Sequence, residues 1–152
     1  MVLEIWPLTA GDDAPRRWRD GPVRRPLAAG ELPDEVVAVA VAETLGHPPW
    51  YVHSTSWRLA GRAVLLTYVA LVGTVDRPDD WPVVRAAGRR RRATSVRPVD
   101  VLDHSLSHLA FLVTYRAGDA GRLTDWSPAL AAWTPRPAGE LTVDPVPRQR
   151  SD

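Results

Sequence analysis

The stretch between Trp50 and Val75 limits the possible folds more than any other part of the chain. Two runs, 50–59 and 62–75, flank the dipeptide Ala60-Gly61, which suits a tight two-residue turn. The pattern predicts a β-hairpin. Its second strand is apolar on both faces, as is typical of a strand in the middle of a sheet. Both faces of the hairpin must therefore pack against other parts of the protein.

Pairing across this turn predicts which side chains share a face, because side chains alternate along a strand. The expected register sets Trp57 opposite Val64 and His53 opposite Tyr68. One face then mixes aromatic and polar groups: Tyr51, His53, Thr55, Trp57 and Tyr68. The other face carries Val52, Leu65, Val69 and Leu71. Few helices are available to cover both faces, so we predict that a second copy covers the latter face in a homodimer.

Two main helices are expected. Pro33 suits a first helical position, Asp34 and Glu35 follow it, and Gly46 stops the pattern, so residues 33–45 are predicted to be helical. Alternating valines there also permit a strand, but the end signals favour a helix. Residues 100–117 have the strongest helical pattern, with Asp100 as N-cap and Gly118 as stop. An apolar stripe runs along this helix: Leu102, Leu106, Leu109 and Val113.

The remaining segments are less regular. Residues 2–6 form a short strand in this interpretation, and residues 11–31 form a loop rich in Pro, Gly and Arg. Short edge strands are expected at 93–99 and 141–146, and a short helix that starts near Ser127-Pro128 and holds Leu130 and Trp133.

These elements predict an α+β fold. We expect a single two-layer domain, in which an antiparallel sheet centred on the 50–75 hairpin packs against the helices 33–45 and 100–117. The length of 152 residues suits one domain. We place the globular domain at 1–146 and a disordered tail at 147–152.

Composition excludes several classes of protein. The chain has no cysteine, which rules out disulfides, thiolate zinc sites and redox dithiols. Its basic residues are all arginine, and asparagine is absent, which indicates a GC-rich bacterial genome. The net charge is only +1, and the run Arg89–Arg92 has no interleaved aromatic residues. Nucleic acid is therefore not expected as a partner.

No targeting or spanning segment stands out. The N-terminus lacks the basic and apolar regions of a signal peptide. The most apolar run, 63–75, is shorter than the roughly 20 residues that a spanning helix needs. We expect a cytoplasmic protein with no membrane partner.

His104 and His108 are the most suggestive polar pair. Their spacing of four places both imidazoles on one face of the predicted helix, within reach of one metal ion. Ser105 stands where zinc hydrolases of the His-Glu-x-x-His type carry their catalytic Glu. No third ligand is fixed, although His53 and Asp103 are candidates. Partly buried structural histidines, a metal site and a non-metal ligand site all remain open, and we predict no resident metal or cofactor.

The mixed face of the hairpin could line a pocket against the second helix, where His53 would meet the helical histidines. The alternative is a sheet–helix interface whose polar tips reach solvent. The candidate ligand-binding residues are His53, Trp57, Tyr68, His104 and His108.

No complete catalytic motif is present: the chain lacks a P-loop, a dinucleotide-binding glycine motif and a nucleophile elbow. The sequence favours a small cytosolic non-enzymatic domain for protein interaction or small-ligand regulation, with a protein partner in the first case. The alternative is a small metal-dependent hydrolase that uses His104 and His108 with His53. The two hypotheses differ in one requirement: the hydrolase needs the three histidines to meet in an open pocket, and the non-enzymatic domain does not.

Overall fold

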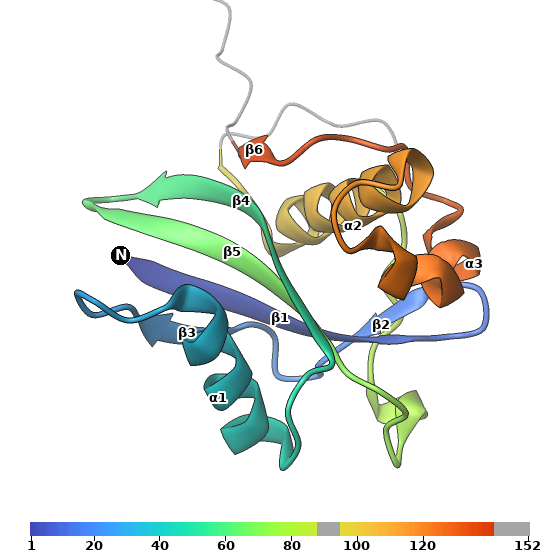
Figure 1. Cartoon of the computed structure of the whole chain (residues 1–152), viewed down its shortest axis with the longest axis horizontal. Helices are drawn as coiled ribbons and strands as arrows, with labels where there is room; N and C mark the ends of the chain where they lie inside the picture. Colours follow the sequence, from blue (N-terminus) through green and yellow to red (C-terminus); the bar gives the residue numbers. More distant parts are fainter. Residues whose placement is uncertain (88–94, 142–152) are drawn as a thin grey trace, which may run out of the picture.

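The computed structural model describes residues 1–87 and 95–141, which form an α+β fold around a mixed six-stranded sheet (Figure 1). The strand order is β2-β1-β5-β4-β6, and β3 also pairs with β1. The strands are β1 (Val2–Ala10), β2 (Pro15–Arg17), β3 (Val23–Pro26), β4 (Tyr51–Ala60), β5 (Ala63–Leu71) and β6 (Gly139–Glu140). The helices are α1 (Pro33–Leu45), α2 (Pro98–Tyr115) and α3 (Ser127–Leu130), with 3-10 turns η1 (Pro78–Asp80) and η2 (Ala120–Trp126).

The central pair of the sheet is parallel. β1 runs beside β5 from Val2 opposite Leu65 to Leu8 opposite Leu71. β4 is antiparallel to β5, whereas β2 and β3 are antiparallel to β1. β3 and β4 therefore run in the same direction, and α1 is the crossover between them, as parallel strands require. The prediction of an antiparallel sheet is wrong for this central pair, because β1 inserts beside the hairpin.

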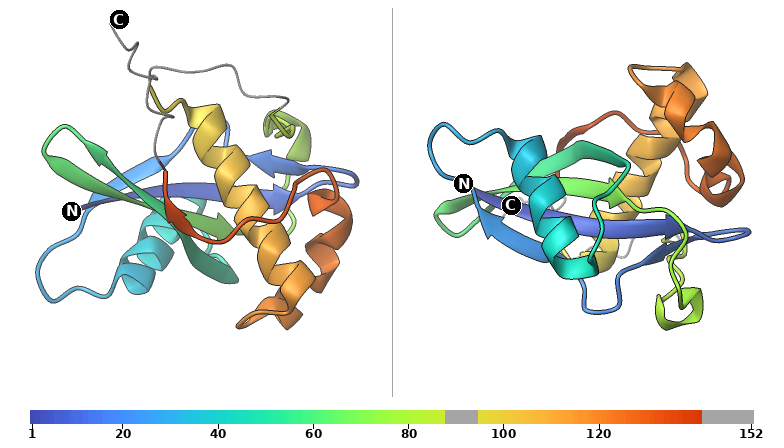
Figure 2. Two further views of the ribbon diagram at one scale, coloured as in Figure 1. Left: turned by 90° about the horizontal axis from the view of Figure 1, so that it is seen from above. Right: turned by 60° about the horizontal axis from the view of Figure 1, so that its bottom comes forward.

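The two main helices lie on opposite faces of the sheet (Figures 1 and 2). Side chains alternate along β1, so Leu3 and Ile5 pack in the cluster with α1, while Trp6 and Leu8 pack in the cluster with α2. The predicted two-layer arrangement is therefore wrong, and the described residues form three layers. The physical reason is that β1 and β5 are apolar on both faces, and each face needs its own cover.

The predicted hairpin is present, but its turn is displaced by one residue. Ala60 pairs with Ala63, so the turn residues are Gly61-Arg62, and Gly61 adopts a left-handed φ of 61°. A register shift also interrupts the pairing between Ser54 and Ser56. His53 consequently pairs with Val69 and not with the predicted Tyr68. A one-residue change of register moves a partner to the other face of the sheet.

Both helices form close to the predicted positions. α1 has the predicted bounds, and Gly46 ends it with a φ of 82° and an N–H donated to the carbonyl of Ala42. α2 begins two residues before the predicted start, with Pro98 at its first position. Asp100 is therefore not the N-cap; it lies at the third position, where its carboxylate accepts the backbone N–H of Arg97 at 2.9 Å.

The expected loop at 11–31 is wrong in part, because it contains β2 and β3. These strands exist because β1 is longer than predicted and offers an edge along which they pair. The short helix expected to start near Ser127-Pro128 is present as α3, but it ends at Leu130 and does not include Trp133. In the expected strand at 141–146, only Leu141 lies within the described residues, where it follows β6 and donates its N–H to the carbonyl of Trp57.

Other predictions fall outside the described residues in whole or in part. The arginine run 89–92 and the tail 147–152 lie outside them. Of the expected strand at 93–99, the described residues show no strand at 95–97, and Pro98 and Val99 belong to α2. Among the described residues, no helix combines the length and apolar character that crossing a membrane requires.

The apolar face that suggested a homodimer is already covered within the chain. Val69 and Leu71 are fully buried in the cluster with α2, and Leu65 is buried as well. Val52 is only partly buried and packs in the other cluster, on the side of α1. The sequence-based reason for a dimer therefore disappears.

A buried ion pair joins the strands at the end of the sheet near the N-terminus. The Glu4 side chain is 2 % exposed and accepts hydrogen bonds from Arg58 on β4 at 2.8 Å and from Arg24 on β3 at 2.9 Å. Arg58 also donates to the hydroxyl of Thr67 on β5. Four strands thus share one carboxylate-centred network, which satisfies a charge that would otherwise be costly to bury.

We expect Glu4→Ala to lower the free energy of unfolding by about 3–5 kcal/mol, because it leaves the largely buried Arg58 without its partner. Glu43→Ala is the matched control: its ion pair with Arg25 is exposed on both sides, so the loss should be below about 1 kcal/mol. Urea denaturation of both variants measures the difference. Equal losses in the two variants would contradict a structural role for the buried pair.

Candidate functional site

A continuous series of aromatic rings lies between β4 and α2, and we call it the aromatic ladder. It consists of Trp50, Tyr51, His53, His108, Phe111 and Tyr115. Neighbouring ring centroids are 4.7–6.0 Å apart. The first three rings come from Trp50, which precedes β4, and from the start of β4, and the last three recur at helical spacing along one face of α2. The ladder is therefore a product of the packing of α2 on the sheet.

His53 and His108 meet at the centre of the ladder. Their Nε2 atoms are 3.1 Å apart, and His108 Nδ1 is 3.2 Å from the carbonyl oxygen of Arg136. A carbonyl can only accept, so Nδ1 of His108 carries a hydrogen and its Nε2 is an acceptor. The Nε2–H of His53 then donates to His108. In this arrangement both imidazoles are neutral: His108 carries its hydrogen on Nδ1, and His53 carries its hydrogen on Nε2.

Burial keeps this histidine pair neutral. Desolvation lowers the pKa of His53 below its ordinary value of 6.5, and the charge of a protonated His108 would lower it further. Desolvation also lowers the pKa of His108, which the hydrogen bond to the Arg136 carbonyl opposes. Both rings are therefore uncharged at neutral pH.

The remaining sequence-predicted residues lie elsewhere. Tyr68 is on the α1 face of the sheet, where its hydroxyl donates to Asp34 at 2.8 Å. Burial, and then this carboxylate, raise the pKa of Tyr68. Trp57 pairs with Leu66, also on that face, and is 40 % exposed. The structure therefore does not bring Tyr68 and Trp57 to the histidines, because the register shift between Ser54 and Ser56 places His53 on the opposite face from them.

His104 is buried on α2, one turn before His108. Between them, Ser105 hydrogen-bonds with Thr55 of β4, with 2.8 Å between the hydroxyl oxygens. Within residues 1–87 and 95–141, no group of three or more His, Cys, Asp or Glu side chains could hold a metal ion. His53, His104 and His108 therefore do not form the three-ligand site that the hydrolase hypothesis requires.

Sequence reasoning missed a cleft at the carboxyl ends of β1 and β5. Its volume is about 680 Å³, within the usual range for small-molecule sites. The end of β1 with the two residues after it (9–12) and the segment that follows β5 (72–75) line the cleft, and η2 forms one wall. The other lining residues are Arg16, Trp50, Pro78 and Asp79, and the wall from η2 supplies Arg122, Asp125 and Trp126. No local motif marks this cleft, since it exists only where β1 and β5 pair.

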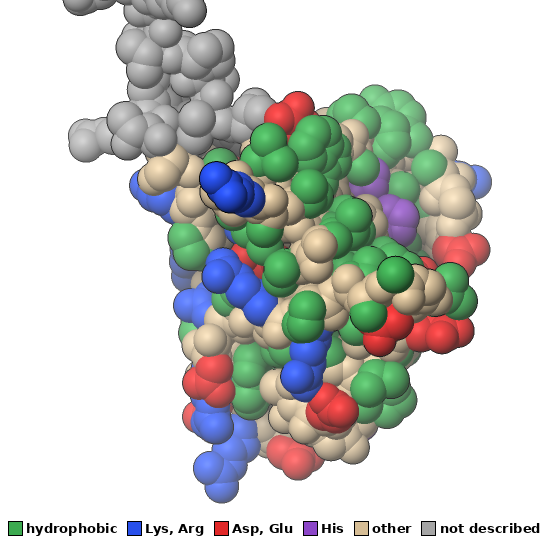
Figure 3. Space-filling view, turned by 90° about the vertical axis from the view of Figure 1, so that its left-hand side faces the viewer, with side chains coloured by type: hydrophobic (Ala, Val, Ile, Leu, Met, Phe, Trp, Pro, Cys, Tyr) green, Lys and Arg blue, Asp and Glu red, His purple; other side chains and the backbone are tan. Residues whose placement is uncertain are grey.

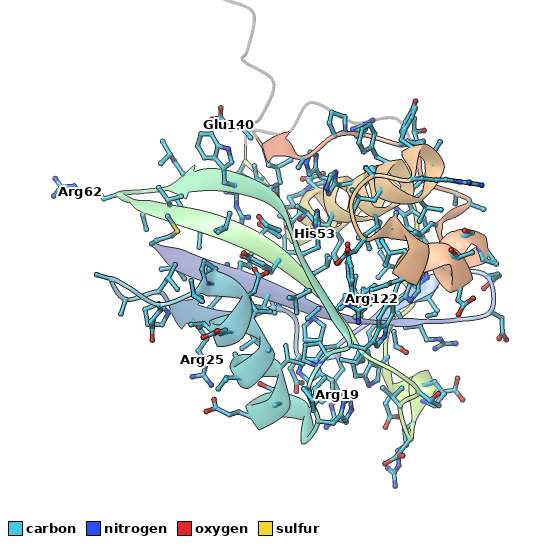
Figure 4. All side chains as sticks on the ribbon, viewed as in Figure 1. Arg19, Arg25, His53, Arg62, Arg122 and Glu140 are labelled. Carbon is cyan, nitrogen blue, oxygen red and sulfur yellow. The ribbon has the colours of Figure 1, made fainter. Side chains whose placement is uncertain are left out.

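Both arginines of the cleft are already engaged. Arg16 donates to the carbonyls of Pro78 and Trp81 at 3.1 and 3.2 Å and lies 3.6 Å from Asp79. Arg122, labelled in Figure 4, donates to the carbonyl of Trp50 and lies over the rings of Trp50 and Tyr51, at 5.8 and 5.9 Å from their centroids. These contacts anchor the walls of the cleft.

The acidic side chains of the cleft have fewer interaction partners than its arginines. Three aspartates line the cleft, and Asp79 is the one beside Arg16. Neither Asp12 nor Asp125 forms an ion pair with any described residue, and both are exposed. The hydroxyl of Thr9 donates to the carbonyl of Gly73 at 3.0 Å. The cleft therefore combines two unpaired carboxylates with indole rings.

No protein-family model matches this sequence, and no curated protein matches it. The ladder and the cleft share Trp50. Arg122 touches both, because the rings at one end of the ladder are the rings over which its guanidinium lies.

We expect acid to destabilise the protein through the histidine pair. The folded-state pKa values of His53 and His108 lie below the unfolded value, so the unfolded state takes up protons first as the pH falls below about 6.5. The free energy of unfolding should therefore decrease from pH 7.5 to pH 5. Urea denaturation in chelator-containing buffer across this range measures the slope.

The double variant His53→Gln, His108→Gln should show a shallower pH dependence than the wild type. His47→Gln is the matched control, because His47 is exposed in the loop after α1. An unchanged slope in the double variant would contradict the assignment of the acid sensitivity to the pair.

Proposed function

We propose that the protein is a non-enzymatic, small-ligand binding domain whose ligand is a small organic cation held in the cleft at the carboxyl ends of β1 and β5. The observation that carries this proposal is the combination of two carboxylates without an ion-pair partner among the described residues, Asp12 and Asp125, with the rings of Trp50 and Trp126 in one cleft.

The position of the cleft supports ligand binding. In open sheets with parallel strands, ligands bind outside the carboxyl ends of the strands, where the connecting segments diverge. β1 and β5 run side by side to the cleft in the same direction, and the N–H of Val72 donates to the carbonyl of Leu8 at the point where they part. The backbone beneath the cleft is thus held by the most regular part of the sheet.

Charge supports a cation. Two arginines and three aspartates line the cleft, which leaves a net negative charge. The arginines are engaged with carbonyls and rings, whereas Asp12 and Asp125 have no cationic partner among the described residues. A ligand with N–H donors would satisfy both carboxylates with charge-assisted hydrogen bonds.

The aromatic rings support a planar cation. Two tryptophans line the cleft: Trp126, which is buried, and Trp50, which is half-buried. The guanidinium of Arg122 already lies over the Trp50 ring, so this ring is suited to a delocalised cation. An amidinium or guanidinium compound fits these features better than a carboxylate or a phosphate does.

A catalytic role has weaker support. No histidine lines the cleft, and the Thr9 hydroxyl is hydrogen-bonded to a backbone carbonyl. The metal-dependent hydrolase alternative has two converging histidines, His53 and His108, but no third ligand among the described residues. Because support for catalysis is weak, we propose that the ligand-bound domain has a regulatory or interaction role.

Benzamidine, agmatine and spermidine at millimolar concentration are suitable first probes, with benzoate as the anionic match for benzamidine. We expect at least one of the cations to shift the backbone amide resonances of residues 9–12 and 72–75, and benzoate to leave them unchanged. Asp125→Asn should weaken binding by roughly tenfold or more, because it removes a charged acceptor.

Asp13→Asn is the control, since Asp13 is exposed, adjacent to Asp12 and not part of the lining. It should bind the cation as the wild type does. Absence of binding for all three cations, or equal effects of Asp13→Asn and Asp125→Asn, would overturn the proposal.

We also propose that the protein is bacterial and cytoplasmic and that it forms a homodimer, through a surface other than the one predicted from the sequence. Support for a different surface comes from large apolar side chains that remain exposed: Leu32, Val39, Trp57 and Leu59. Light scattering at tens of micromolar should give twice the chain mass of 16.8 kDa, and Leu59→Glu should lower it. A wild-type mass of one chain would contradict the dimer.

A further inference from the structure

The two histidines at the centre of the ladder have an arrangement that a single metal ion can use. We infer that the Nε2 atoms of His53 and His108 form a binding site for one divalent transition-metal ion with a preference for imidazole, such as Zn²⁺, Ni²⁺ or Cu²⁺. This inference is independent of the cleft and of its proposed ligand.

The distance between the two nitrogens supports a shared ion. Bonds from zinc to imidazole nitrogen are about 2.0–2.1 Å long, so two nitrogens 3.1 Å apart subtend an angle of roughly 100° at the metal. That value is close to the tetrahedral angle. The ring centroids are 5.2 Å apart and the two Nε2 atoms face each other across the gap, so a tilt of the rings brings both lone pairs onto one ion.

The outer nitrogen of His108 is held as in metal-binding histidines. Its Nδ1–H donates to the carbonyl of Arg136, and the backbone N–H of Arg136 in turn donates to the carbonyl of Ser107 at 3.0 Å. Histidine ligands commonly donate their second N–H to such a carbonyl, which fixes the ring and makes the other nitrogen a better ligand. The Nε2 lone pair of His108 is therefore presented from a rigid helix.

His53 is the ligand that adjusts. Its ring is half-buried on β4, next to Tyr51, and histidine side chains reach the surface among hydrophobic side chains in the space-filling view (Figure 3). When the ion binds, the hydrogen bond between the two Nε2 atoms breaks and two bonds to the metal form. The His53 proton moves from Nε2 to Nδ1, so no net proton is released. Water completes the coordination.

Titration of tag-free, chelator-treated protein with ZnCl₂ tests this inference by calorimetry at pH 7.5. We expect one ion per chain and a binding heat that does not depend on the ionisation enthalpy of the buffer. His53→Gln should weaken binding at least tenfold. His47→Gln, the exposed control, should bind as the wild type does.

Two further measurements keep the test decisive. Circular dichroism checks that His53→Gln is folded, and Cu²⁺ should selectively broaden the ring resonances of His53 and His108 in the NMR spectrum of the wild type. Absence of zinc binding at 1 mM, unchanged binding in His53→Gln, or an equal loss in His104→Gln would overturn the two-histidine site. Benzamidine binding by His53→Gln shows separately whether the cleft binds an organic cation.

Discussion

The parallel pairing of β1 with β5 is the constraint on which the rest of the structure depends. Both strands are apolar on both faces, so neither can lie at an edge or face solvent on one side. β1 therefore occupies the middle of the sheet, with β2 and β3 on its other edge. Parallel neighbours cannot be joined by a tight turn, and the crossover through α1 covers one face while α2 covers the other.

The α2 face contains more polar groups than an interior of this kind usually does. Two pairs of these groups meet across the boundary between strand and helix: His53 with His108, and Thr55 with Ser105. Buried polar groups are costly without partners, so these pairs select one position of α2 on β4. The register shift between Ser54 and Ser56 lies beside them, where the strand departs from regular pairing. The same packing that makes the core therefore creates the histidine pair.

The two candidate sites arise from different parts of this architecture. The cleft forms where β1 and β5 end and their following segments separate, so it depends on strand direction. The histidine pair depends on the angle at which α2 crosses the sheet. Arg122 links them only structurally, because its guanidinium lies over rings at the end of the ladder while its side chain forms part of the cleft wall.

Local chemistry in the sequence determined the elements that need no distant partner. Pro33 and Gly46 set the bounds of α1, Gly61 marked the hairpin, and a spacing of four placed His104 and His108 on one helical face. Only the tertiary structure decided the strand pairing and which side chains meet. β1 and β5 are about sixty residues apart in the chain, and turns at 60–61 and 61–62 are equally compatible with one glycine. That choice moves each partner by two positions and leaves the faces unchanged, whereas the register shift between Ser54 and Ser56 adds one residue to β4 and so places His53 and Tyr68 on opposite faces.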